Sequence, residues 1–349
     1  ATAFNRLHMQ KNEGGSVPEE FRTEYVADRA QTMATAFMGL TMECSRCHDH
    51  KYDPIPMKEY YSTFAFFNNI DEAGLYSFFT KAVPSPTMSV MSAEEKRDLA
   101  EKQRKLTEST ARLEAVEKSE KAAFERWKKQ WDGRVAIRGL IGDFDFDKAG
   151  EGRIPNLAAS DSPGTYKSAY SKVVPGQAGN GLLLDGDSGL DFGDVGPFER
   201  HRDFSFSLWV NTPLSHKRAV ILHRSKAWTD AGSRGYELLM VDGKIEVALV
   251  HFSPGNEIRI RSKEKLELDC WKQITVTYDG SSRASGIRLY FDGEPVAAEV
   301  LKDHLTKEIF YPKENEAGLT VGARFRDNGF KQSKVDGLRF FDRRLTALE

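Results

Sequence analysis

Two cysteines and a histidine stand together in Cys44-Ser45-Arg46-Cys47-His48, in a chain that contains three cysteines. This C-x-x-C-H spacing is typical of a c-type haem, whose vinyl groups are attacked by the two thiols and whose iron is bound by the adjacent histidine. The sequence therefore predicts haem c on Cys44 and Cys47, with His48 as the proximal iron ligand. The third cysteine, Cys270, stands alone and is expected to be a small buried apolar side chain.

Residues around this motif could support such a haem. His50 follows His48 by two residues, too few to reach the opposite face of a porphyrin. We therefore expect His50, Lys51 or Arg46 to bind a haem propionate through charge-assisted hydrogen bonds. An opposite axial ligand must come from farther along the chain, and the candidates are His8, which we favour, Met9, Met42 and Met57. An open sixth position would instead favour small-molecule chemistry.

Two other kinds of site compete with haem. Zinc could be bound by Cys44, Cys47 and one or two of His48, His50 and His8, although the usual second pair of ligands at a distance is missing. A plain disulfide or redox C-x-x-C is the third hypothesis, but no βαβ pattern surrounds the motif to suggest a thioredoxin-like fold.

Helical patterns dominate the first third of the chain. Apolar spacing between Glu24 and Met42 predicts a helix whose buried stripe comprises Tyr25, Ala30, Met33, Phe37 and Met38. Ser92 stands three residues before Glu95, as in a capping box, and predicts the start of a densely charged helical arm that runs to Trp131. Its narrow apolar seam, expected to pack within the chain, consists of Leu99, Leu106 and Leu113.

From about residue 134 the apolar period changes from 3.6 to 2. Phe204, Phe206 and Leu208 alternate with serines, and Asp242-Gly243 separates two apolar runs as in a type I′ hairpin. Many short strands of this kind predict an antiparallel β-sandwich. The expected fold class is thus a small helical and loop-rich haem module (residues 1–82), a charged helical arm (83–133) and an antiparallel jelly roll (134–349).

Composition excludes some partners. The chain has 349 residues with 50 Lys plus Arg against 52 Asp plus Glu, a net charge of −2, which argues against general electrostatic binding of nucleic acid. No stretch approaches the roughly 18 apolar residues of a transmembrane segment. The chain opens at Ala1 without Met, so we expect a processed or excised piece whose parent polypeptide is largely missing.

Residues 1 to about 75 resemble the planctomycete-type cytochrome c domain, a family largely of unknown function found in large exported bacterial proteins. The matching motifs, in order, are Phe4-Asn5-Arg6-Leu7-His8-Met9, Asn12-Glu13-Gly14-Gly15, Pro18-Glu19-Glu20-Phe21-Arg22, Tyr25-Val26-Ala27-Asp28-Arg29, the run from Gly39 to Ile55, Tyr60-Tyr61 and Phe66-Phe67-Asn68-Asn69. The resemblance implies haem c on Cys44, Cys47 and His48, and it aligns the family's first-motif histidine with His8. It also implies a periplasmic or extracellular location and a redox partner protein.

Residues 136 to 349 resemble the laminin-G-like, concanavalin A-like jelly roll. The matching runs are Gly181 to Gly186, Phe204 to Val210, Trp271 to Gly280, Leu289 to Gly293 and Val335 to Phe341. This fold hosts lectins, adhesion modules and glycosidases. The Glu-x-Asp-x-Glu arrangement of the related glucanases is not present, so hydrolysis is not expected.

The jelly roll is instead expected to bind a glycan or a protein partner, with a purely structural role as the alternative. Exposed aromatic residues such as Trp228 or Tyr236 could contact a sugar. Calcium is a weaker prediction, because the three aspartates concerned also stand where turn formers are common. These aspartates are Asp185, Asp187 and Asp191. The combined expectation is an exported electron-transfer protein with a recognition module; the alternatives are a binding module with a structural zinc site and a haem oxidase or peroxidase acting on polysaccharide.

Overall fold

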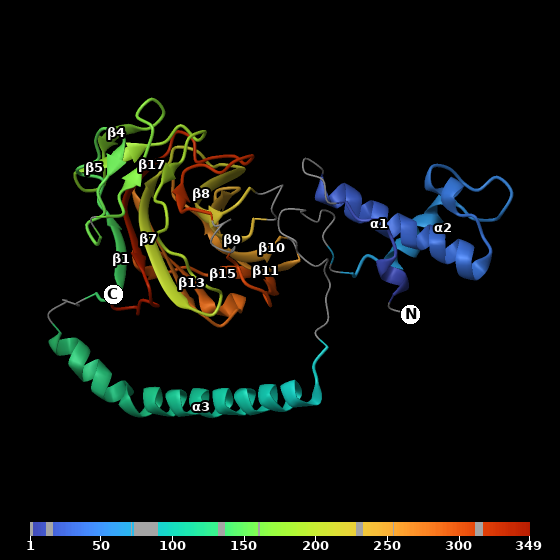
Figure 1. Ribbon diagram of the computed structural model, residues 1–349, viewed down its shortest axis with the longest axis horizontal. Helices are drawn as coiled ribbons and strands as arrows, with labels where there is room; N and C mark the ends of the chain where they lie inside the picture. Colours follow the sequence, from blue (N-terminus) through green and yellow to red (C-terminus); the bar gives the residue numbers. More distant parts are fainter. Residues whose placement is uncertain are drawn as a thin grey trace. The chain divides into compact units, whose positions relative to one another are not determined.

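The computed structural model describes residues 3–11, 17–70, 72, 90–131, 137–159, 161–227, 233–253, 255–310 and 317–349. The chain has three parts: an N-terminal module (residues 3–72), a helical arm (90–131) and a β-sandwich (137–349) (Figure 1). Residues 87–137, which include the arm, separate as a compact unit of their own. The domain boundaries proposed from sequence remain predictions.

The N-terminal module is built from short helices around a small core. They are η1 (Phe4–Arg6), α1 (Pro18–Met33), the π-helical turn η2 (Ala34–Met38), the 3₁₀ turn η3 (Glu43–Arg46), α2 (Met57–Ser62) and the 3₁₀ turn η4 (Thr63–Phe66). Helix α1 begins with proline and carries Glu19 and Glu20 in its first turn, both of which favour a helix start. The core consists of Val26, Ala27, Ala30, Ala34, Met42, Tyr60, Phe64 and Phe67.

The predicted apolar stripe of α1 is only partly buried. Tyr25 and Ala30 are buried, whereas Phe37 and Met38 are 74% and 58% exposed, so the prediction is wrong for these last two residues. The cause is the π-helical turn η2, because each π-type turn holds more residues than an α-turn and rotates the following side chains off the buried face. The helix then ends at Gly39, whose φ of +65° is left-handed.

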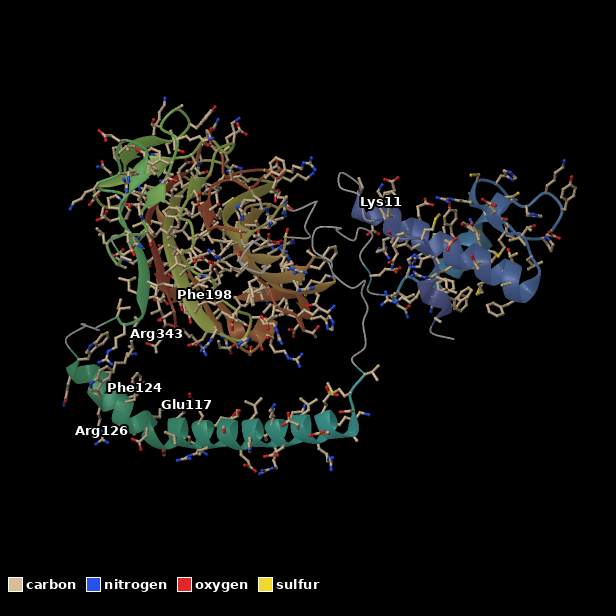
Figure 2. All side chains as sticks on the ribbon, viewed as in Figure 1. Lys11, Glu117, Phe124, Arg126, Phe198 and Arg343 are labelled. Atoms are coloured by element: carbon tan, nitrogen blue, oxygen red, sulfur yellow. The ribbon has the colours of Figure 1, made fainter. Side chains whose placement is uncertain are left out.

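The arm is helix α3 (Ala93–Gln130), and it begins with the predicted capping box: the Ser92 side chain accepts from the Glu95 amide, and the Glu95 side chain accepts from the Ser92 amide. None of the α3 residues that the structure describes is buried, including the leucines of the seam. Side chains such as Glu117, Phe124 and Arg126 project from the helix (Figure 2). Among the described helices, none combines the length and the apolar character needed to cross a bilayer.

The sandwich consists of two antiparallel sheets, which confirms the predicted fold of this region. The first sheet contains β14 (Glu294–Pro295), β13 (Ile287–Phe291), β12 (Lys272–Asp279), β7 (Asp203–Asn211), β17 (Lys334–Phe341), β5 (Asn180–Leu183) and β4 (Lys172–Pro175) in spatial order, with β1 (Leu140–Phe144) also paired to β17. The second contains β15 (Ala298–His304), β11 (Asn256–Lys265), β10 (Lys244–Phe252), β9 (Gly235–Val241), β8 (Arg218–Ser225), β16 (Thr320–Val321), β6 (Leu190–Asp191), β3 (Gly164–Thr165) and β2 (Arg153–Ile154).

The core lies between the sheets and follows the alternation seen in the sequence. Phe206 on β7 stands opposite Val276 on β12 and Phe340 on β17, and all three are buried. The predicted hairpin at Asp242-Gly243 joins β9 to β10, and both residues have positive φ (51° and 79°), as a type I′ turn requires. Successive side chains of a strand point to opposite faces of the sheet, so every second residue directs its aromatic or aliphatic side chain into the core.

Two histidines make the stability of the sandwich depend on pH. Burial and the positive charge of Arg324 lower the pKa of His223 to about 4, and burial and Arg234 lower that of His251 to about 4. The unfolded chain binds these protons at higher pH than the folded chain does, so stability falls as the pH drops from about 6.5 to 4. We expect His223 alone to account for a loss of about 3 kcal/mol.

Urea unfolding followed by tryptophan fluorescence checks this expectation. The unfolding midpoint should decrease from neutral pH to pH about 4, and His223→Gln should reduce that decrease. The control variant His304→Gln alters an exposed histidine and should leave it unchanged. A midpoint independent of pH over this range would contradict the assignment of neutral buried histidines.

Candidate functional site

The C-x-x-C-H motif lies on and directly after η3, a 3₁₀ turn, and the geometry of this turn decides which side chains share a face. A 3₁₀ helix has three residues per turn, so residues three apart lie on the same face. Cys44 and Cys47, the residue that ends the turn, therefore share one face, and both are exposed without forming a disulfide. Ser45 occupies another face and is fully buried. Both thiols are thus presented together to solvent.

Hydrogen bonds close the following loop onto η3. The Ser45 hydroxyl and the His50 amide both donate to the Ile55 carbonyl, at 3.0 Å and 2.9 Å. The Asp49 carboxylate accepts from the amide of Met57, the first residue of α2, at 2.8 Å. Ser45, Asp49 and His50 therefore hold the backbone around the two thiols in place.

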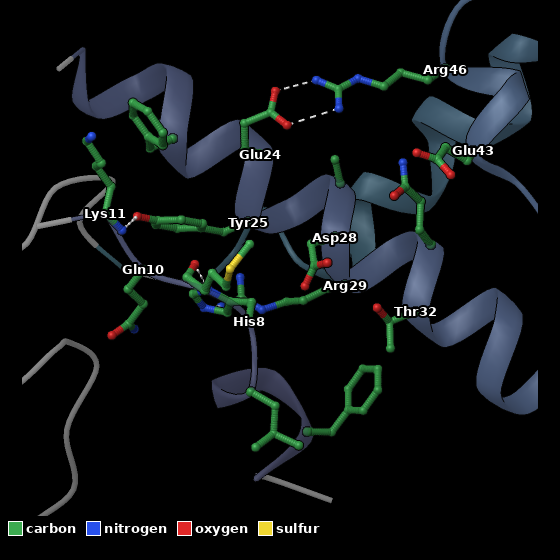
Figure 3. Close-up of a pocket in the computed structure, with 16 residues that line it drawn as sticks. His8, Gln10, Lys11, Glu24, Tyr25, Asp28, Arg29, Thr32, Glu43 and Arg46 are labelled. Carbon is green, nitrogen blue, oxygen red and sulfur yellow. Dashed lines mark hydrogen bonds and ion pairs between the residues drawn. The ribbon is translucent and has the colours of Figure 1, made fainter.

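A second set of contacts ties η3 to α1. The Arg46 guanidinium forms a two-point ion pair with Glu24 (Figure 3). The Tyr61 hydroxyl, on α2, donates to the Arg46 carbonyl at 2.9 Å. The hydrogen bond from Arg46 lowers the pKa of Glu24. Because Arg46 is already paired in this way, the structure gives no support to its predicted role as a propionate ligand.

His48 and His50 differ in the contacts that their Nδ1 atoms make. His48 Nδ1 lies 2.8 Å from the Asp49 carbonyl, which can only accept, so Nδ1 carries a proton and, in the neutral ring, Nε2 keeps its lone pair. Metal-binding histidines typically donate their second N–H to an oxygen in the way His48 does. His50 Nδ1 lies 2.9 Å from the Asp53 amide and 3.2 Å from the Asp53 carboxylate. Because a carboxylate already lies beside this ring, the geometry gives the predicted propionate role of His50 no support.

Lys51, the remaining propionate candidate, is exposed, and its ammonium lies 5.3 Å from the centre of the Tyr52 ring. Of the methionines proposed as distal ligands, Met42 is buried in the module core, Met9 is 92% exposed and Met57 is 42% exposed. Met42 is therefore engaged in the core, whereas Met9 and Met57 are open to solvent.

His8 belongs to a buried ionic cluster. Its Nδ1–H donates to the Met9 carbonyl at 2.9 Å, its Nε2 accepts from Arg29, and its ring stacks on Tyr25 with a centroid separation of 4.5 Å. Arg29 also pairs with Glu72. An iron ligand would need the Nε2 lone pair that Arg29 already occupies, so this geometry gives the predicted distal role of His8 no support.

Sequence reasoning missed Arg29 and Glu72. A signal for Arg29 existed, because it stands four residues after Tyr25 and next to Ala30, on the apolar face of α1, where an arginine requires a buried partner. Burial raises the pKa of Glu72, but the hydrogen bonds and the charge of Arg29 outweigh burial and lower it below its usual value. Glu72 is therefore a buried carboxylate, and the stability that its pairing contributes is lost in acid.

Replacing Arg29 by methionine should destabilise the N-terminal module by about 3–5 kcal/mol, because it leaves the Glu72 charge buried without a cation. Hydrogen exchange of the α1 amides measures this local stability. The matched control is Arg22→Met, whose ion pair with Glu19 is largely exposed and should be worth less than about 1 kcal/mol. Equal protection of α1 in both variants would contradict the cluster's stabilising role.

A cavity of about 680 Å³ lies beside this cluster within the module (Figure 3). Glu43 and Arg46 line it from η3, Glu24 lines it from α1, and Met9 and Lys11 line it from the N-terminal segment. The volume is in the range of small-molecule pockets. Cys44 and Cys47 are not among its lining residues, so the thiols lie outside this cavity.

The aspartates proposed for calcium serve local turns. Asp185 accepts from the amides of Asp187 and Ser188 at 3.0 and 2.9 Å, and Asp191 accepts from the Gly193 amide at 2.8 Å. No group of three or more His, Cys, Asp or Glu side chains able to hold a metal ion occurs in the described part of the chain. The predicted calcium site and the zinc alternative at Cys44 and Cys47 therefore gain no geometric support.

One of the two aromatic residues suggested for sugar contacts is buried. Tyr236 is 2% exposed, and its hydroxyl donates to the Gly196 carbonyl at 2.9 Å, because the residue lies on the inward face of β9. It therefore cannot contact a glycan, and that suggestion is wrong. Trp228 lies outside the described residues.

Two family models match the chain. Residues 1–72 match a family described as protein of unknown function (DUF1549), and residues 184–349 match the concanavalin A-like lectin/glucanases superfamily. Among curated proteins, none matches the chain.

Solved structures resemble the sandwich at low identity. Domain 4 of AbnA, an extracellular arabinanase from Geobacillus stearothermophilus in complex with arabinotriose, is 19% identical with a TM-score of 0.46 over 60% of this chain and 94% of that one. The binding domain of Paraclostridial Mosquitocidal Protein 1 is 15% identical with a TM-score of 0.46, over 60% and 50% of the two chains. The receptor binding domain of botulinum neurotoxin D is 12% identical with a TM-score of 0.42, over 60% and 50%.

This chain thus spans about half the length of the two toxin domains. The chain thus contains an N-terminal segment similar to the DUF1549 family and a sandwich similar to the concanavalin A-like superfamily.

Proposed function

We propose that the N-terminal module carries a covalently attached haem c and transfers electrons, while the sandwich recognises a glycan or a partner protein. The observation that carries this proposal is the arrangement on η3: two exposed thiols share one face, and the adjacent His48 keeps the lone pair of Nε2. This combination meets the requirements of covalent attachment and of iron ligation from one short segment.

In this proposal the residues of the motif and those directly after it have distinct roles. Cys44 and Cys47 form the thioether links, and His48 Nε2 binds the iron while the Asp49 carbonyl holds its ring through Nδ1–H. The ring of His50 and the ammonium of Lys51 supply donors for the propionates. Bound haem supplies one-electron chemistry at iron. Thioether attachment also implies export, so we propose a periplasmic or extracellular location and an external redox partner.

A second function is favoured by the contacts of His8. Its Nε2 accepts from Arg29, and Met42 is buried in the core, so two of the candidate distal ligands in the described residues are engaged elsewhere. A five-coordinate haem would bind small molecules and support oxidase or peroxidase chemistry, including action on a polysaccharide held by the sandwich.

Spectroelectrochemical titration of the haem-loaded chain tests these functions. A reversible one-electron transition in a low-spin protein that does not bind carbon monoxide supports an electron carrier. High-spin bands and carbon monoxide or cyanide binding support the oxidase or peroxidase. Stoichiometric zinc without iron in chain purified from a host that matures c-type haem would overturn both.

A further inference from the structure

A buried ionic cluster fixes the loop between β16 and β17. The Arg324 side chain is 1% exposed, and its guanidinium donates to Ser225 Oγ at 3.0 Å, to Glu237 Oε2 at 2.6 Å and to Asp327 Oδ2 at 2.6 Å. Asp327 also accepts two bonds from Arg218, each at 2.9 Å. Arg324 and Asp327, three residues apart in this loop, thereby bond it to both β8 and β9.

The residues between these two anchors point outward. Phe325 is 72% exposed, and Arg326 has a φ of +58°, a conformation that a non-glycine residue adopts only when its surroundings enforce it. The Arg326 guanidinium lies 5.2 Å from the centre of the Phe325 ring. Here the charged Arg324 is buried while its aromatic neighbour is exposed, the reverse of what hydropathy favours. The anchored loop therefore presents an aromatic ring to solvent, with the Arg326 guanidinium over one of its two faces.

A pocket of about 790 Å³ opens beside this aromatic ring. Four segments of the sandwich line it, with Asp187, Lys226, Thr320 and Phe325 among the lining residues. The volume lies in the range of small-molecule pockets. Carboxylate, ammonium and hydroxyl groups next to an aromatic face provide both halves of sugar recognition: polar groups for the ring hydroxyls and an apolar surface for the C–H face.

The charges in the lining decide between neutral and acidic sugars. Arg324 is compensated by Glu237 and Asp327, and the lining holds the acidic Asp187 as well as the basic Lys226 and Arg326. Opposite charges are therefore mixed across the pocket, whereas an anion site would gather cations alone.

We propose that this pocket is a glycan-binding site whose ligand is a neutral polysaccharide, with one sugar ring stacked on Phe325 and its hydroxyls bonded to Asp187, Lys226 and Thr320. The proposal rests on the recognition role proposed for the sandwich and names its site and ligand class. It is independent of haem in the N-terminal module.

Affinity electrophoresis of the full chain tests the proposal. The gels contain arabinan, xylan, mannan or mixed-linkage glucan as neutral probes, and alginate or polygalacturonate as acidic ones. At least one neutral polysaccharide should retard the chain, and Phe325→Ala should weaken that binding about tenfold or more, which corresponds to about 1.4 kcal/mol. Phe325→Trp should preserve it. The matched control is Tyr170→Ala, which removes an exposed aromatic residue that does not line the pocket.

The outcomes separate the site from the broader function. Retardation that Phe325→Ala leaves unchanged overturns the pocket while the glycan-binding role stands. Retardation by the acidic probes alone overturns the proposal of a neutral ligand if Lys226→Met abolishes that retardation and Phe325→Ala preserves it. No retardation by any probe, with a native unfolding midpoint, overturns both the pocket and glycan recognition by the sandwich, and leaves the protein partner as its ligand.

Discussion

Replacing Cys44 and Cys47 together by alanine should abolish covalent haem completely, because no other thiol stands next to His48, the proposed iron ligand. Each single replacement should leave at most one thioether and lower the yield of haem-bound chain. Haem staining of the denatured chain in a gel measures attachment, and expression must take place in a host that matures c-type haem.

Cys270 provides the matched control. It lies half-buried two residues before β12, where its thiol approaches the Glu267 carbonyl at 3.8 Å, so it belongs to the sandwich and has no adjacent histidine. Cys270→Ala should stain as strongly as the unaltered chain. Staining that persists in the double variant, or that disappears with Cys270, would contradict haem attachment at the motif.

Replacing Glu237 by alanine should destabilise the sandwich by about 3–5 kcal/mol, the second large effect. The Glu237 carboxylate is 1% exposed and accepts from Arg324 and Arg259, each at 2.6 Å. Burial raises its pKa, but Arg324, Arg259 and Arg218 outweigh burial and lower it to about 2. Removing this carboxylate leaves arginines buried with part of their compensating charge gone, and that desolvation cost is the source of the destabilisation.

Urea unfolding at neutral pH, followed by tryptophan fluorescence, measures the effect. Glu264→Ala is the control, because Glu264 is an exposed residue on β11 and its removal should change stability by less than about 0.5 kcal/mol. Equal midpoints for the two variants would show that the ionic cluster is not coupled to global stability.

Local patterns made much of the fold predictable. Alternation in Phe204, Phe206 and Leu208 identified the inward face of β7, and Asp242-Gly243 identified a type I′ hairpin because two positive φ angles favour that dipeptide. The capping box at Ser92 correctly placed the start of α3. Each of these signals lies within a few residues, so the sequence alone carries it.

Features that depend on distant residues could not be predicted in this way. His8 was expected to be a free ligand, but its partners Arg29 and Glu72 are 21 and 64 residues away along the chain. The π-helical turn η2 places Phe37 and Met38 at the surface, and no local sequence pattern predicts that change in the helical period. The exposure of Phe325 likewise follows from the ion pair of Arg324 with Glu237, 87 residues away.

At the motif itself, sequence and structure supplied different information. Spacing identified Cys44, Cys47 and His48 as a unit, but which nitrogen of His48 keeps a lone pair depends on the Asp49 carbonyl. His50 has different neighbours, because its Nδ1 contacts both the amide and the carboxylate of Asp53. These contacts distinguish two histidines that residue type alone does not.

The intact mass of the denatured chain, purified after expression with c-type haem maturation, tests the central proposal most directly. Covalent attachment predicts that the mass exceeds that of the polypeptide by one haem, and that the added mass survives both unfolding and extraction with acidified acetone. A chain of unmodified mass, with Cys44 and Cys47 recovered as thiols or as a disulfide, would contradict it.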